Sequence, residues 1–264
     1  MTLKIVDGEK EIIDEAHDKE PQIIKLSASA MKTYEQCPRK YFFTYIEKAP
    51  KKEWDHFDLG NLCHKALEVF HKIYMEEGTN KGSLSKLMKH AFTEARASLG
   101  KKLEDKMIEE AYNLLMGYLK NVSKSGMPMV KGVESAFTFK IREDILIRGF
   151  IDRLDVIKDG RFHIVDYKTT KNEYYLEPFQ LLIYGLWLRQ EFGNIDSYKA
   201  SYVLLRHNSK YKEYEFNAFD LDKTEKQVIG YAEKIGAENT WVPVPSKLCN
   251  WCDFKEICPA HTAW

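Results

Sequence analysis

The sequence has 264 residues, of which 44% are hydrophobic and 13% aromatic, enough apolar surface for a sizeable core in one large domain or two small ones. Its 40 basic and 40 acidic side chains leave a net charge near zero, which neither requires nor excludes a nucleic-acid partner because binding depends on local clusters of Lys and Arg. No apolar run approaches the ~20 residues of a membrane helix, and the acidic N-terminus has no signal-peptide core. We therefore expect a soluble, intracellular (cytoplasmic) protein.

The N-terminal part of the sequence predicts an arm followed by an interrupted helix. Residues 1–24 have no clear periodicity, so a weakly structured N-terminal arm is expected there. Ser27 and Ser29 offer N-caps for a helix, and Pro38 should kink or split that helix. Cys37 lies at the expected break.

A helical block is expected at about 61–124. Apolar residues recur at helical spacing from Asn61 to about Glu77. Two more amphipathic helices are expected near 84–98 and 104–124. This block precedes the strands.

The pattern then changes to the period of a strand. Alternating side chains indicate strands at 133–141, 145–157 and 161–170, and Asp159-Gly160 between the last two is a strong hairpin signal. The rest predicts a helix, two strands, a helix and an irregular tail, at 178–192, 197–207, 211–219, 221–237 and 238–264. This order predicts an α/β (mixed α+β) fold with a central mixed sheet flanked by helices.

Two carboxylates and an ammonium group converge at one end of the expected hairpin. A two-residue turn at Asp159-Gly160 would place Asp152 opposite Tyr167. Asp152 would then lie between Asp166 and Lys168 of the partner strand. A bulge or a one-residue slip would instead place Asp152 directly beside Asp166 or Lys168.

Carboxylates this close repel one another unless a positive charge lies between them. A hard cation such as Mg²⁺ or Mn²⁺ meets that need, and it would polarise a phosphoryl oxygen and lower the pKa of a bound water. Lys168 could orient or deprotonate that water and offset charge in the transition state. The competing interpretation is an amphipathic hairpin with solvated charges, which is what we expect for Asp155, Lys158 and Asp159.

The five cysteines suggest a metal or cluster site more than disulfides in a reducing compartment. A C-x-x-C pair, a third cysteine six residues later and a remote fourth could form a Cys₄ site from Cys249, Cys252, Cys258 and Cys37. Such a site can hold Zn²⁺ or a 4Fe–4S cluster. Spacing alone does not separate the two, although three cysteines plus one favour iron–sulfur. The site would clip residue 37 to residues 249–258, and Cys63 is expected to be a buried free cysteine.

Together these residues resemble the PD-(D/E)XK nuclease signature in its RecB-like form, as in CRISPR-associated four-cysteine nucleases. Asp152 followed by Asp166-Tyr167-Lys168 resembles the signature itself. The segment GNLCH, which ends in His64, resembles the family's glycine-to-histidine motif, and QLLIY is similar to its Q-x-x-x-Y motif. The cysteines match the family's iron–sulfur pattern, and the matches span residues 26–259 in the family's order.

The resemblance implies a restriction-endonuclease-like core and a role for each matched residue. Residues 25–264 would form a single nuclease domain, with its core at about 130–237 and the iron–sulfur clip at 37 and 249–258. The metal ligands would be His64, Asp152, Asp166 and the Tyr167 backbone carbonyl. Lys168 would be the catalytic lysine, and Gln180 and Tyr184 would contact DNA or position the lysine and the water. Glu134 is the candidate for an extra acid, and Asp166 stands where many relatives have Glu.

Substrate contacts need cationic or aromatic side chains. The cationic candidates are Arg39, Lys40, Arg148, Arg153, Lys171 and Arg206. The aromatic candidates for stacking on unpaired bases are Tyr34, Tyr41, Tyr174, Tyr175 and Trp251. No base-reading motif is visible, so we expect little sequence specificity.

The leading interpretation is a Mg²⁺/Mn²⁺-dependent deoxyribonuclease, expected to be an exonuclease on DNA ends or single-stranded DNA in repair, recombination or CRISPR adaptation. The helical block at 61–124 would narrow access to the site and favour threaded single strands. The sequence contains no P-loop, so unwinding would need a helicase, CRISPR or recombination partner.

Two alternatives stay open. One is a non-catalytic Cys₄ module that binds DNA or a helicase partner; it predicts loss of an acid or the lysine, whereas Asp152, Asp166 and Lys168 are all present. The other is a restriction-type endonuclease, for which no target-recognition region is visible.

Overall fold

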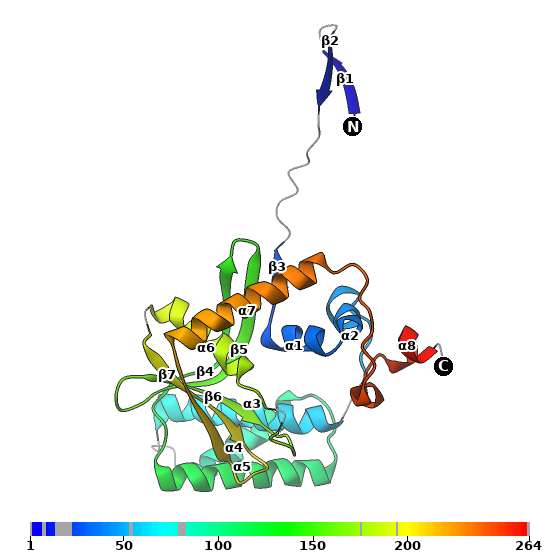
Figure 1. Cartoon of the computed structure of the whole chain (residues 1–264). Coiled ribbons are helices and arrows are strands. Elements are labelled where there is room, and N and C mark those ends of the chain that lie inside the picture. The colour runs from blue at the N-terminus through cyan, green and yellow to red at the C-terminus, as the bar shows by residue number, and fades with distance from the viewer. Residues whose placement is uncertain are drawn as a thin grey trace.

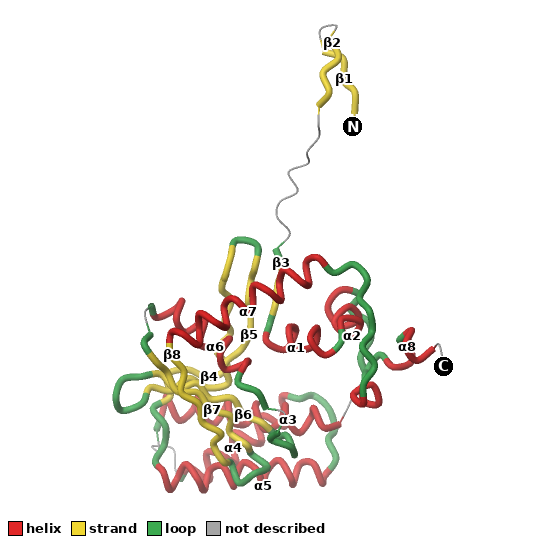
Figure 2. The backbone as a smooth tube through the Cα atoms, viewed as in Figure 1, coloured by secondary structure: helices red, strands yellow, loops and turns green. Residues whose placement is uncertain are grey.

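A computed structural model describes residues 2–6, 9–13, 23–52, 55–78, 83–174, 176–193 and 195–262. A central six-stranded sheet lies between two layers of helices (Figures 1 and 2). This arrangement confirms the expected mixed α/β fold with helices on both faces of the sheet. Within the described part of the chain, no helix is long and apolar enough to cross a membrane.

The sheet is mixed, and β5 pairs with three other strands. Its order is β3–β5–β6–β7–β8, with β4 on the other side of β5. The β3/β5 and β6/β7 pairs are parallel and the others antiparallel. The strands are β3 (Ile24–Leu26), β4 (Val130–Arg142), β5 (Ile145–Val156), β6 (Phe162–Lys168), β7 (Ser197–Leu204) and β8 (Lys210–Asn217).

One side of β5 is only partly paired. β3 pairs with Ile145–Ile147 and β6 pairs with Arg153–Val156, whereas β4 follows nearly all of β5 on the opposite side. Residues 148–152 therefore have no strand partner on the β3/β6 side among the described residues. The sheet is open at this point.

The connection between β5 and β6 differs from the predicted two-residue turn. The Ile157 N–H donates to the Arg161 carbonyl at 2.9 Å, so residues 158–160 form a three-residue loop, and Gly160 takes the left-handed φ of 84° that such loops require. Arg153 consequently pairs with Val165. The ladder is one residue out of the predicted register, and its continuation places Asp152 beside Asp166.

The N-terminal segment contains more structure than the expected arm. Strands β1 (Thr2–Val6) and β2 (Glu9–Ile13) form an antiparallel pair. Residues 1, 7–8 and 14–22 of the expected arm lie outside the described residues. The short strand β3 was also not predicted, because three residues are too few to show a period.

The expected helix break at Pro38 is confirmed. Helix α1 (Ala28–Gln36) begins at the N-cap Ser27, whose hydroxyl accepts from the Ala30 N–H at 3.1 Å. Cys37 is extended, with φ of −166°, and α2 (Pro38–Tyr41) starts with proline at its first position. A π-helical turn, η1 (Phe42–Ile46), follows.

One helical layer consists of α3 (Asp55–Glu77), α4 (Leu84–Ser98) and α5 (Asp105–Ser125). The three predicted helices are confirmed, except that α3 begins six residues before Asn61. Their apolar faces share one core with Val165 and Tyr167 of β6, Val203 of β7 and Leu205, which follows β7. His64 therefore lies in the middle of α3, and not in the first turn where a helix starting at Asn61 would place it.

The other layer consists of α1, α6 (Phe179–Phe192) and α7 (Ala218–Ala237). α6 is apolar around most of its circumference, as suits a helix buried between the sheet and α7. Gly185 allows α6 to approach the sheet, since a Cβ there would lie 2.0 Å from the Tyr198 hydroxyl. The C-terminal segment has only short elements, η2 (Lys247–Trp251), η3 (Lys255–Ile257) and α8 (Pro259–Thr262).

Candidate active site

Three elements bring potential metal ligands together at the open part of the sheet. His64 from α3, Glu134 from β4 and Asp152 from β5 offer ligand atoms that all lie within 4.8 Å of one another. The His64 Nδ1 is 3.3 Å from an Asp152 carboxylate oxygen. An imidazole nitrogen with two carboxylates is a donor set that suits a divalent cation. These residues could therefore hold one.

Glu134 reaches this group through a strained backbone. Its φ is 44°, a left-handed conformation that is uncommon for a residue other than glycine. It lies between Val133 and Ser135, which pair with Arg153 and Ile151, so it sits opposite Asp152. Burial and the neighbouring Asp152 carboxylate raise the pKa of Glu134 to about 7. A cation would favour the ionised form of this carboxyl.

His64 and Asp152 stabilise each other's charged form. Burial alone would lower the pKa of His64, but the Asp152 carboxylate outweighs it and raises the pKa to about 9. Burial opposes ionisation of Asp152, yet His64 and the Tyr167 N–H, which donates at 2.7 Å, lower its pKa overall. Asp152 is therefore an ionised carboxylate with one oxygen fixed by the backbone of β6.

Lys168 belongs to a closed ring of four polar side chains. Its ammonium group is 2.7 Å from Asp166 and donates to the Gln180 carbonyl oxygen at 3.0 Å. The Gln180 amide donates to the Tyr184 hydroxyl at 2.5 Å, and that hydroxyl donates to Asp166 at 3.3 Å. The four-residue spacing on α6 places Gln180 and Tyr184 on one helical face. The ring holds the ammonium group in one position.

Asp166 is the most deeply placed acid of the site. It is 1% exposed, and burial raises its pKa, with Lys168 opposing and Asp152 adding to the effect. A cation or a retained proton must therefore offset the charge of this cluster, since Asp152, Asp166 and Glu134 supply three carboxyl groups against one lysine and one histidine.

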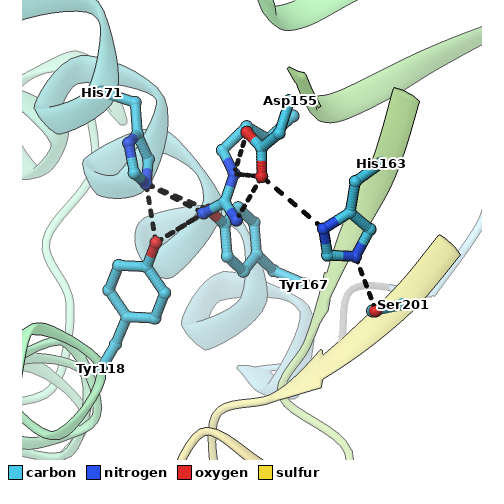
Figure 3. A network of polar contacts seen from close by, with 7 residues as sticks. His71, Tyr118, Asp155, His163, Tyr167 and Ser201 are labelled. Atoms are coloured by element: carbon cyan, nitrogen blue, oxygen red, sulfur yellow. Dashed lines mark hydrogen bonds and ion pairs between the residues drawn. The ribbon is translucent and has the colours of Figure 1, made fainter. Parts of the chain in front are cut away.

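A second polar network lies behind the site, between the sheet and helices α3 and α5 (Figure 3). The Arg153 guanidinium, 1% exposed, bonds to Asp155 at 2.9 Å and donates to the hydroxyls of Tyr118 and Tyr167 at 2.5 Å. His71 contacts both tyrosine hydroxyls, at 2.8 and 3.2 Å. Five side chains from α3, α5, β5 and β6 are thereby tied together.

This network corrects two expectations. Arg153 was a candidate DNA contact, but its guanidinium is buried and paired with Asp155. Asp155 was expected to be solvated and is also buried. Tyr184, which lies outside this network, is 5% exposed and directs its hydroxyl at Gln180 and Asp166, which fits the implied positioning role.

Two clefts meet at the site. One is lined by cations from several elements, Lys65, Lys168, Lys171 and Arg206, together with His64, Glu134 and Tyr167. The other runs over the open part of β5 and is lined by Ser27, Ser29, Thr138, Arg148, Gln180 and Tyr184. Among the described residues, only Phe150 and Asp152 line both clefts. A long substrate could therefore pass the carboxylates without entering a closed cavity.

The four predicted cysteine ligands lie together, apart from the two clefts at the carboxylates. Cys37, Cys249, Cys252 and Cys258 line one cavity. Arg39 lies there as well, over the rings of Phe42 and Phe43, and it does not line either cleft at the carboxylates. Cys63 is fully buried, as predicted, and burial raises its pKa to about 12.

Several aromatic candidates for base stacking serve the core instead. Tyr34 and Tyr41 pack on Trp241, and Tyr41 is buried. Tyr174 and Trp251 are exposed. Tyr175 lies outside the described residues.

Known proteins share the fold or part of the sequence of this chain. The crystal structure of a candidate exonuclease from Eubacterium rectale shares the fold with a TM-score of 0.52 and 13% identity, covering 95% of each chain. One subunit of the ATP-dependent helicase/deoxyribonuclease from Streptococcus mutans is 30% identical over 176 residues, which is 60% of this chain and 15% of that protein. The equivalent protein from Streptococcus pyogenes serotype M3 is 27% identical over 198 residues, 69% of this chain and 18% of its own length.

The fold is thus that of the restriction-endonuclease-like nucleases, with a helix on either side of the sheet carrying part of the site. The profile of the PD-(D/E)XK nuclease superfamily matches residues 25–259, and the chain belongs to that superfamily. It spans less than a fifth of the length of the helicase/deoxyribonuclease subunits that it matches.

Proposed function

We propose that this chain is a DNA nuclease that uses Mg²⁺ or Mn²⁺, acts as an exonuclease on DNA ends or single strands, and forms one nuclease domain over residues 25–264. The observation that carries the proposal is the convergence of the His64, Glu134 and Asp152 group with the Lys168–Asp166 pair. A bound cation would polarise the scissile phosphate and lower the pKa of a water. Lys168, held by Gln180 and Asp166, would orient that water and offset the charge that develops on the phosphate.

The first experiment measures cleavage of end-labelled single- and double-stranded DNA by the full chain, with Mn²⁺, with Mg²⁺ and with EDTA. We expect cleavage only with a metal, and loss of it in Lys168→Ala. Lys140→Ala is the matched control, because Lys140 is an exposed lysine that pairs with Glu143 near the end of β4. If wild type cleaves no more DNA than the background seen with Lys168→Ala, the non-catalytic DNA-binding module would be favoured instead.

Comparing linear with closed circular DNA tests whether cleavage starts at an end. An exonuclease needs an end, so linear DNA should be degraded and closed circular DNA of the same sequence should persist. Equal degradation of linear and circular DNA would indicate an endonuclease instead of an exonuclease.

The metal ligands can be assigned by titration. We propose His64, Asp152, Asp166 and the Tyr167 carbonyl, with Glu134 as an additional acid. Because the set mixes nitrogen and oxygen donors, Mn²⁺ should bind more tightly than Mg²⁺. Calorimetric Mn²⁺ titration of Glu134→Gln and Asp166→Asn would show which acid binds the ion, since a ligand should lower the affinity about tenfold or more.

We further propose that Cys37, Cys249, Cys252 and Cys258 hold a 4Fe–4S cluster, with Zn²⁺ as the alternative. Their convergence in one cavity supports it, as do backbone N–H groups of Val244 and Ser246 that donate to the sulfurs of Cys37 and Cys249 at 3.4 and 3.3 Å. Protein purified without oxygen should absorb near about 400 nm and contain iron. Cys252→Ser should lose this band, and Cys63→Ala should keep it.

A helicase or recombination partner is part of the proposal. The matched relatives are named as helicase/deoxyribonuclease subunits, and this chain has no P-loop. Long blunt duplexes should therefore resist the isolated chain and become substrates when a helicase and ATP are added.

A further inference from the structure

Phe150 is an aromatic residue that the proposed chemistry leaves without a role. Its side chain is 61% exposed, and it lies two residues before Asp152 on β5. Exposure alone says little, because Phe219 at the start of α7 is 76% exposed. The position of Phe150 distinguishes it. Of all described residues lining the two clefts, Phe150 and Asp152 alone line both.

The local structure explains why this ring stays uncovered. The residue opposite Phe150 on β4 is Ala136, which is small and itself exposed. On the other side of β5, residues 148–152 have no strand partner in the part of the chain that the structure describes. Neither neighbour can therefore shield the ring.

The surroundings favour a nucleic-acid strand over an apolar partner. Arg148, exposed two residues before Phe150, lines one cleft, and Lys168, Lys171 and Arg206 line the other. Two residues of a strand span roughly 7 Å. The cation of Arg148, the ring of Phe150 and the carboxylate of Asp152 therefore follow one another along β5 at nearly equal spacing. A backbone of phosphates flanked by cations, with an aromatic face for a base, is how proteins hold single strands without reading sequence.

We propose that Phe150 stacks on an unpaired base next to the scissile phosphate, and that this contact makes single-stranded DNA the preferred substrate. The inference rests on the proposed nuclease function and adds the substrate class. A paired base offers its faces only to its neighbours in the duplex, so stacking on Phe150 requires a strand that is already open.

The test compares Phe150→Ala, Phe150→Leu and Phe150→Trp, with Phe219→Ala as the matched exposed-phenylalanine control. On a single-stranded oligonucleotide, Phe150→Ala should lower kcat/KM about tenfold, mainly by raising KM, because stacking acts on binding. Phe150→Trp should retain activity, and Phe150→Leu should behave like Phe150→Ala. All variants should keep the wild-type melting temperature.

A second readout locates the base. With Ca²⁺ in place of Mn²⁺, the affinity for an oligonucleotide carrying one abasic position is measured as that position is moved along the strand. Wild type should bind about tenfold more weakly at one position, and Phe150→Ala should show no such position. Coupling of this kind identifies a direct contact.

The outcomes separate the two proposals. Cleavage by wild type together with unchanged kcat/KM in Phe150→Ala, or equal activity of the Leu and Trp variants, would overturn the stacking inference alone. Absence of any metal-dependent cleavage, with the abasic effect still present in wild type, would overturn the nuclease function and keep the contact.

Discussion

Consecutive residues of β5 and β6 supply two polar clusters of opposite character. Asp152 and Lys168 face a cleft with His64 and Glu134, Asp166 is buried beside Lys168, and the three carboxyl groups outnumber the lysine and the histidine. Arg153 and Tyr167, the residues next to them in the chain, belong to a buried network in which the guanidinium bonds to an acid, two hydroxyls and an imidazole. Apart from the His71 Nδ1 atom, the polar groups of this network bond to one another, whereas the acidic cluster needs a cation or a retained proton.

The difference teaches that the two clusters have separate roles. A buried network whose charges are paired stabilises and fixes the strands, whereas a cluster with unpaired charge is suited to binding and reaction. Alternation along a strand allows the two to be adjacent in sequence and separate in environment. Each substitution below should therefore affect activity or stability, and seldom both.

The largest effect is expected for Asp152→Asn. Cleavage should fall roughly 10³-fold or more, the scale on which removal of a transition-state contact acts. The free energy of unfolding should stay within about 1 kcal/mol of wild type, because asparagine can still accept from the Tyr167 N–H. Single-turnover kinetics and urea denaturation test the pair of expectations. A large loss of stability would contradict the separation of roles.

Arg153→Met should have the opposite profile. It leaves the Asp155 carboxylate buried without its partner, which costs about 3–5 kcal/mol of unfolding free energy. Urea denaturation measures this loss. The double variant Arg153→Met with Asp155→Leu should recover much of it, since no buried charge remains. A loss below about 1 kcal/mol in the single variant would show that the network is not structural.

His163 borders the buried network, since its Nδ1 lies 3.9 Å from the Asp155 carboxylate, and it makes the stability of the fold depend on pH. Burial, with Arg153 and Lys199 adding to it, lowers the pKa of His163 to about 4. The ordinary value of about 6.5 applies in the unfolded chain, so the unfolded chain binds the extra proton first. The free energy of unfolding therefore does not depend on His163 above pH 6.5. It falls as the pH falls from 6.5 towards 4, by up to about 1.4 kcal/mol per pH unit. His163→Gln should show a flatter stability profile in this window, and an unchanged slope would reject the assignment.

The smallest effect is expected for Tyr167→Phe. It removes a hydroxyl that contacts Arg153, Tyr118 and His71, at a cost of about 1–2 kcal/mol. The backbone N–H that fixes Asp152 remains, so kcat should change less than about threefold. A loss of activity as large as that of Asp152→Asn would show that the hydroxyl contributes to the chemistry.

Much of the acidic cluster could be predicted from the sequence because its residue types and order are distinctive. His64, Asp152, Asp166, Lys168, Gln180 and Tyr184 all converge as expected, and Glu134 joins them although its match was loose. The register of the hairpin was not predictable, because Asp-Gly fits both a two-residue turn and a three-residue loop with a left-handed glycine. The choice between them depends on packing along the strands.

The buried network could not be predicted for a different reason. Arg153 and Asp155 have the same residue types as solvated strand charges, and His71 lies 82 positions from the arginine that it contacts. Burial of such groups depends on helices α3 and α5 closing over the sheet. The local signal is an Arg and an Asp two residues apart, directly after the candidate metal ligand Asp152.

Helix α3 carries a residue of each cluster. His64 and His71 are seven positions apart, roughly two turns or about 10 Å along a rigid rod. Any coupling between an ion bound at His64 and the network around His71 would act through this helix, and it would be reciprocal. If an intact network increases metal affinity by some factor, metal binding must stabilise the network by the same factor. Hydrogen exchange of the amides around His71 should then slow once the metal binds.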